Sequence, residues 1–333
     1  MNRRIVRLGA VLSLLAFAAS AWPEKAAPPP IAATRLVTRL VLLGTAAGPV
    51  PRALRSQPAN LVQVGDRNYL VDAGEGVVRQ LAALGLQPRN IDTVFLTHLH
   101  MDHVAGLAPL IGMRWVARAR GQIAVYGPAG TAALVEGALD SMAEPEALSV
   151  AEMPPGPRMA TTVRAVDEQG DGPVVWFQDD RVRVTAVANS HYQTIAPALL
   201  PPGARSYALR FDTPDRSIVF TGDSGPSDAI AKLAKGADIL VSEVINLPAT
   251  IAFVARQYHV APAAMAPQVR HMSEEHLTPE EIGKIANRAG VKMVVLTHFA
   301  PGLDTETDMR TYTAGVRVFF KGPVVAGRDL DEF

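Results

Sequence analysis

Residues 93–103 read Thr-Val-Phe-Leu-Thr-His-Leu-His-Met-Asp-His, and this stretch decides both the fold and the chemistry expected of the chain. It begins with an apolar run that predicts a strand and ends with three imidazoles and one carboxylate. These groups are preferred ligands of zinc and similar divalent ions. On an extended backbone His98 and His100 point to the same side, so both can bind one ion. Asp102 and His103 follow where the chain turns, and they can reach a second ion.

Three further candidates each follow an apolar or alternating segment: His191 after 182–187, Asp223 after 217–222 and His298 after 293–297. Strand ends that meet along one edge of a sheet form a natural shared site. Taken alone, His191 or His298 is interpreted as a core or loop histidine. Taken together with residues 98–103, they predict a single metal centre.

The His-x-His-x-Asp-His pattern after an apolar strand resembles the signature of the metallo-β-lactamase superfamily, whose members are mostly dinuclear metal hydrolases. The resemblance covers about residues 38–330 and implies an α/β protein with a four-layer αββα sandwich. The implied ligands of the first ion are His98, His100, His191 and Asp223, and those of the second are Asp102, His103, Asp223 and His298. We therefore expect two divalent ions, with zinc as the first choice and manganese or iron as alternatives.

Within the superfamily the chain is similar to the group of ribonuclease Z and its arylsulfatase-like relatives. Residues 71–76, Val-Asp-Ala-Gly-Glu-Gly, resemble a turn of that group, and His276-Leu277-Thr278 resembles the segment that carries its extra catalytic histidine. Glu243 matches the glutamate of the group's His-Glu-Ala-Thr motif, although Ser242 replaces the histidine. Residues 51–56 keep little of the Pro-x-x-x-Arg-Asn stretch of true ribonuclease Z, which argues against tRNA as the substrate.

The resemblance also implies roles for three residues. Asp102 would orient or deprotonate the attacking water, and His276, held by Glu243, would protonate the leaving oxygen or bind an oxyanion. From the residues alone, His276 can equally be a surface histidine that precedes a helix. Tyr192 and Tyr207 can line the pocket or belong to the core.

Charge and cysteine content exclude several kinds of partner and ligand. Lysine and arginine number 32 and so do aspartate and glutamate, and without the three arginines of residues 1–21 the balance is 29 against 32, a net charge near minus three. Proteins that bind long nucleic acids usually carry a basic excess, so such a partner is not expected. The chain has no cysteine, which excludes thiolate ligands and disulfides.

The N-terminus predicts export. Three arginines precede the apolar run 8–18, and Ala19-Ser20-Ala21 has the small-x-small pattern of a signal-peptidase site, so residues 1–21 are interpreted as a signal peptide. A retained membrane anchor is the alternative. Residues 22–35 predict an extended tether, and residues 36–333 a single hydrolase domain. We expect a periplasmic or secreted protein without stable membrane insertion once the signal is removed.

Together these features predict an exported dinuclear hydrolase, ribonuclease Z-like, that cleaves a small phosphodiester through a metal-bridging hydroxide. An arylsulfatase and a lactonase are the alternatives. A tRNA 3′-processing enzyme and a non-catalytic metal-binding protein are less favoured. The expected partner is a small-molecule ester, and a homodimer is left open.

Period-two and continuous apolar runs predict ten strands: 36–43, 60–64, 69–71, 93–97, 122–126, 182–188, 206–211, 217–221, 239–242 and 291–297. Helices are predicted at 76–84, 131–142, 227–235 and 279–289. In the last, Thr278 is the expected N-cap, Glu281 completes a capping box and Gly290 ends the helix. Residues 143–180 and 246–272 lack family character and are interpreted as lids or as surface decoration.

Overall fold

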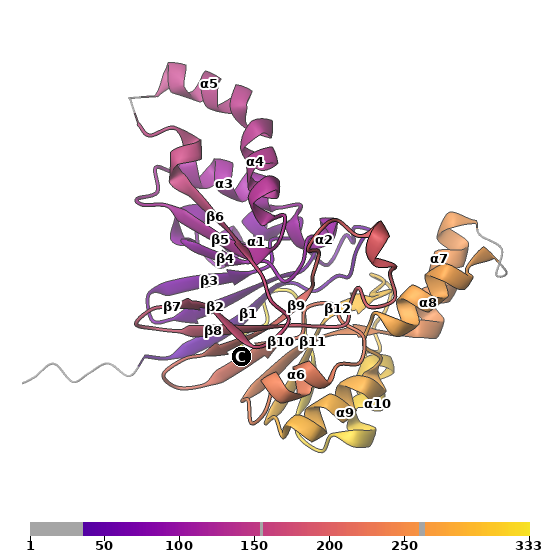
Figure 1. Ribbon diagram of the computed structural model, residues 1–333. Helices are drawn as coiled ribbons and strands as arrows, with labels where there is room; N and C mark the ends of the chain where they lie inside the picture. Colours follow the sequence, from indigo (N-terminus) through magenta and orange to yellow (C-terminus); the bar gives the residue numbers. More distant parts are fainter. Residues whose placement is uncertain (1–35, 154–155, 260–263) are drawn as a thin grey trace, which may run out of the picture. The chain divides into compact units, whose positions relative to one another are not determined.

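The computed structural model describes residues 36–333 except 154–155 and 260–263, so the predicted signal peptide and tether lie outside the described residues. Two sheets form the centre of the domain (Figure 1). The first contains, in spatial order, β1 (Thr38–Gly44), β2 (Ala59–Val64), β3 (Arg67–Val71), β4 (Thr93–Phe95), β5 (Ile123–Pro128) and β6 (Val163–Glu168). The second contains β13 (Val324–Ala326), β12 (Met293–Ala300), β11 (Ile239–Ile245), β10 (Ser217–Phe220), β9 (Tyr207–Asp212), β8 (Arg183–Ala188) and β7 (Val174–Gln178).

Helices cover the outer face of each sheet, which gives four layers (Figure 1). On the first sheet lie α1 (Val77–Ala83), α3 (Leu107–Val116) and α4 (Thr131–Ser141), and on the second lie α6 (Asp228–Leu233), α9 (Pro279–Ala289) and α10 (Arg310–Phe319). The facing sheets share a third apolar core, in which the rings of Phe95 and Phe211 meet edge to face with centroids 5.3 Å apart. The predicted αββα sandwich is therefore confirmed.

The remaining helices are α2 (Met101–Val104), α5 (Ala143–Glu152), α7 (Leu247–Tyr258) and α8 (Ala266–Glu274), with short 3₁₀ turns at Pro88–Asn90, Met159–Thr162 and Pro197–Leu199. None of the helices in the described part of the chain is long and apolar enough to cross a membrane.

Strand direction brings the candidate residues to one edge. Because β8 and β10 are both antiparallel to β9, they run the same way, and β10, β11 and β12 are mutually parallel. His191 and Asp223 each follow the carboxyl end of one of these strands. In the first sheet β3 and β4 are parallel, and Asp72 and His98 follow their carboxyl ends in the same way.

A β-bulge interrupts the pairing of β11 with β12. Ser242 pairs with Leu296 and Val244 with Phe299, so Glu243 stands opposite two residues, Thr297 and His298. His298 has φ 46, in the left-handed region. The bulge bends the strand locally and re-aims its side chains, as bulges beside active sites do. The apolar pattern predicts a strand that ends before His298, whereas β12 continues to Ala300.

Other predictions need correction. Residues 163–168 and 174–178, inside the segment interpreted as a lid or decoration, are the edge strands β6 and β7. Edge strands are partly exposed to solvent and tolerate charged residues. Their apolar residues therefore do not alternate clearly with polar ones, and the sequence does not show the strand. The helix 279–289 is confirmed, with Thr278 accepting from the Glu281 N–H and Gly290 at φ 65. The Glu281 carboxylate accepts from Lys284 (2.6 Å), and no bond to the Thr278 N–H is found, so the capping box is not formed.

Candidate metal centre

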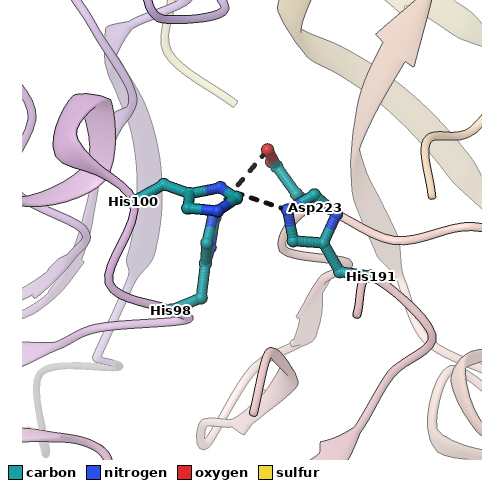
Figure 2. Close-up of side chains that lie close together, drawn as sticks. All are labelled: His98, His100, His191 and Asp223. Atoms are coloured by element: carbon teal, nitrogen blue, oxygen red, sulfur yellow. Dashed lines mark hydrogen bonds and ion pairs between the residues drawn. The ribbon is translucent and has the colours of Figure 1, made fainter. Parts of the chain in front are cut away.

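The first ligand cluster joins the two sheets. His98 and His100 come from the segment between β4 and α2, His191 follows β8, and Asp223 follows β10. Their donor atoms all lie within 4.8 Å of one another. His191 Nε2 is 3.2 Å from His100 Nδ1, and His98 Nε2 is 3.8 Å from Asp223 Oδ2. Figure 2 shows these four side chains converging on one point.

The second cluster lies directly beside the first and contains Asp102, His103 and His298. Asp223 reaches it as well, with Oδ1 3.4 Å from His103 Nε2 and Oδ2 3.2 Å from His298 Nε2. Asp102 Oδ2 lies 3.6 Å and 3.4 Å from the same two nitrogens. The structure therefore brings all seven predicted ligands together, in two clusters that share Asp223.

The donor atoms fit a divalent cation. The Nε2 atoms of His98, His103 and His298 are buried and have no hydrogen-bond partner among the residues that the structure describes. Burying polar atoms without partners is costly, and three such atoms facing two carboxylates are what a metal ion would satisfy. Imidazole and carboxylate together suit zinc, manganese or iron.

Hydrogen bonds on the far edge of three of the rings, those of His98, His103 and His191, orient them and favour one tautomer. His98 Nδ1 lies 3.1 Å from Thr97 Oγ1, whose hydroxyl donates to Asp72. His103 Nδ1 is 2.9 Å from Asp72 Oδ2, and His191 Nδ1 is 2.9 Å from the Glu275 carbonyl oxygen. With a proton on Nδ1 of these three histidines, their Nε2 atoms can present lone pairs to the clusters, as metal binding requires.

Sequence reasoning did not assign a role to Asp72 or Glu275. Asp72 has φ 61, and its position directly after β3 and before a glycine-rich turn is a signal that could have found it. Glu275 contributes through its backbone carbonyl, which no residue pattern reveals.

Burial and neighbouring charges favour the metal-binding protonation state for His98 and Asp223, but not for His103. Burial, reinforced by His103, lowers the pKa of His98 well below its usual value. Burial would raise the pKa of Asp223, but His298 and His103 keep it well below the usual range. Burial opposes charge on His103 too, yet Asp223, Asp72 and Asp102 raise its pKa well above normal. A divalent cation would displace that proton, so metal binding is expected to release protons.

The predicted pair of His276 and Glu243 lies next to the clusters. His276 Nδ1 is 2.6 Å from Glu243 Oε2, and Glu243 Oε1 accepts from the Ser224 N–H at 2.6 Å. The His276 ring centroid is 5.0 Å from that of His191. Burial alone would lower the pKa of His276, but Glu243 raises it to about 9. Glu243 therefore favours the protonated form of His276 at neutral pH, beside the ligands.

The structure gives different positions to the two tyrosines for which the sequence allows either the pocket or the core. The Tyr192 ring centroid lies 4.9 Å from that of His191 and 5.4 Å from that of His100. Together with the loop around residues 195–206, Tyr192 lines a pocket of about 610 Å³. Tyr207 is fully buried and donates to the Gly170 carbonyl, so it belongs to the core.

Comparison with known proteins assigns the family. Residues 67–299 match the beta-lactamase superfamily domain. Ribonuclease Z of Mycobacterium sp. (strain KMS) is 34% identical over 300 residues, which cover 87% of this chain and 94% of that protein. The chain belongs to the metallo-β-lactamase superfamily. Within the superfamily it falls in the ribonuclease Z-like group.

Solved structures of the metallo-β-lactamase superfamily share this fold. The metallo-beta-lactamase fold protein YhfI from Bacillus subtilis has a TM-score of 0.61 at 21% identity, covering 89% of this chain and 98% of its own. The short form of human tRNase Z (ELAC1) has a TM-score of 0.59 at 20% identity, with the same coverage of each chain. As a member of the superfamily, the protein is a metal-dependent hydrolase that acts on ester bonds and binds divalent metal.

Proposed function

We propose that the protein is an exported phosphodiesterase that uses two divalent ions, zinc first among them, to hydrolyse a small phosphodiester. The observation that carries the proposal is the His276–Glu243 pair beside two ligand clusters that share Asp223. A phosphodiester needs both charge neutralisation at phosphorus and protonation of a poor leaving alcohol. The clusters and the pair supply these two functions separately.

Two bound ions would polarise the phosphoryl oxygens and activate the attacking water. Asp102 would orient that water, because its Oδ2 accepts from the Gly48 N–H at 2.9 Å and is held in one place. His276 would give its proton to the leaving oxygen, and Glu243 would stabilise the imidazolium before transfer. The pocket beside Tyr192 would accept part of the ester.

The similarity to ribonuclease Z supports RNA as a second candidate substrate. The charge balance opposes it, because residues 22–333 carry 29 basic against 32 acidic side chains and long-RNA binding depends on phosphate neutralisation. We therefore favour a small ester.

A panel of substrates tests this order. Purified protein with measured metal content is expected to hydrolyse bis-p-nitrophenyl phosphate at least about tenfold faster than p-nitrophenyl sulfate, a simple lactone or a tRNA precursor with a 3′ trailer, because the site is matched to a phosphodiester. Faster turnover of the sulfate or lactone would assign the enzyme to that rival class. Efficient trimming of the precursor would assign it to tRNA processing, and full metal content without any turnover would contradict the phosphodiesterase proposal.

Export is the second part of the proposal and rests on residues 1–21. Expression of the full chain in a Gram-negative host should yield a periplasmic protein whose first residue is Trp22, as N-terminal sequencing of the fractionated material would show. In the matched variant Ala21→Tyr, the bulky side chain at the cleavage position should leave a longer, uncleaved species. Recovery of an intact N-terminus in the cytoplasm would rule out export by this segment.

A further inference from the structure

A further imidazole, that of His271, stands at the edge of the site and has no part in the mechanism above. His271 lies on α8, and its ring centroid is 5.3 Å from that of His276 and 5.9 Å from that of His191. The rings of His191 and His276 are 5.0 Å apart, so the three imidazoles form a close triangle. One corner of it is a metal ligand and another is the proposed proton donor.

A buried carboxylate orients this imidazole. His271 Nδ1 is 2.7 Å from Oε2 of Glu275, one helical turn later, and the Glu275 side chain is fully buried. The Glu275 backbone carbonyl binds His191 Nδ1. A buried carboxylate is costly for the fold, and here its residue holds a metal ligand with one group and a rim histidine with another. Glu275 is therefore a positioning residue for His271.

The orientation leaves one edge of His271 toward solvent. Because the Glu275 carboxylate binds Nδ1, Nε2 is the ring atom that is left to bind a ligand. The His271 side chain is 42% exposed, whereas that of His276 is 13% exposed. His276 thus lies deep beside the ligands, and His271 lies one ring further out. A group bonded to the leaving oxygen would pass His276 and then meet Nε2 of His271.

We propose that His271 is a specificity-determining residue that binds a hydroxyl on the leaving alcohol of the ester. This inference rests on the proposed function, because the position of the leaving alcohol follows from the role of His276. It defines the substrate class as a phosphodiester of a polyol or sugar, whose neighbouring hydroxyl forms a hydrogen bond with Nε2. An alkyl ester of the same length lacks that hydroxyl.

The test compares glycerol 1-phosphate with propyl phosphate, two ligands that differ only in hydroxyl groups. Isothermal titration of metal-loaded protein should show tighter binding of glycerol 1-phosphate by about fivefold, the worth of about one hydrogen bond. His271→Ala should abolish the preference by weakening glycerol 1-phosphate alone. His271→Gln should restore part of it, because the glutamine amide can also form a hydrogen bond with a hydroxyl. His259→Ala, which removes an exposed histidine at the end of α7, is the matched control and should behave as wild type.

Turnover of the corresponding methyl phosphodiesters should follow the same pattern, with His271→Ala raising KM for the glycerol ester and leaving kcat within about twofold. The proposal is overturned if wild-type protein does not distinguish the two ligands, or if His271→Ala weakens both equally. Retained discrimination without any diester turnover would leave the role of His271 intact and reject the phosphodiesterase function. Diester turnover that is unaffected by His271→Ala would support the phosphodiesterase function and reject the role of His271.

Discussion

Asp223→Asn is expected to remove bound metal and to lower kcat/KM by about 10³-fold or more. Asp223 is the one side chain that contributes to both clusters, with oxygens 3.2 Å from His298 Nε2 and 3.4 Å from His103 Nε2. An amide has no charge and only one acceptor oxygen, so the first cluster loses its only carboxylate and the second keeps only that of Asp102. Metal content by mass spectrometry and kcat/KM on bis-p-nitrophenyl phosphate are the two measurements.

The control for Asp223→Asn is Asp228→Asn, which changes an exposed aspartate paired with Arg288 and should leave both measurements unchanged. A chelator should lower the melting temperature of wild type, because a ligand bound only to the folded state stabilises it. It should not lower that of Asp223→Asn further. An Asp223→Asn protein that retained two ions and wild-type activity would contradict the shared-ligand arrangement.

His276→Ala is expected to lower kcat by about 10²- to 10⁴-fold for an ester with an alkyl leaving group, while the metal content stays unchanged. His276 binds Glu243 through Nδ1 and contributes to neither cluster, so its loss removes the proton donor and not the ions. The defect should be much smaller for a p-nitrophenyl ester, because p-nitrophenolate leaves without protonation. The measurement is the ratio of kcat values for the two esters.

The pH profile gives an independent check on the proton donor. His276 must be protonated to act, so activity should fall as pH rises through its pKa of about 9. In Glu243→Gln the stabilising charge is gone, and the fall should begin at lower pH. Equal defects of His276→Ala on both esters, with no shift in Glu243→Gln, would indicate that His276 only holds the substrate.

The sequence predicts those site residues that lie close together in the chain or directly after an apolar strand. His98, His100, Asp102 and His103 lie within six residues, and Asp223 follows a strongly apolar strand, so pattern and position were enough. The pairing of His276 with Glu243 joins residues 33 apart and came from resemblance, since no rule of spacing brings them together.

Some residues and elements cannot be predicted from the sequence because their role or form depends on what packs against them in the fold. His271 and Glu275 lie on or beside a largely polar helix with no motif, and they matter only because α8 packs near His191. The helix α3 was missed because Pro109 and Gly112 read as breakers, although proline is tolerated in the first turn of a helix. The short strand β13 carries too few residues to show a period.

The bulge in β12 shows that this strand is one residue longer than its hydrophobic pattern requires. Leu296 and Phe299 both face the outer core although they are three positions apart, and strict alternation would point them to opposite faces. Removing His298 would restore regular pairing and leave Leu296 and Phe299 on their present face. The residue that the core can spare is therefore the one that supplies a predicted metal ligand, and the length of the strand at this point serves the site and not the core.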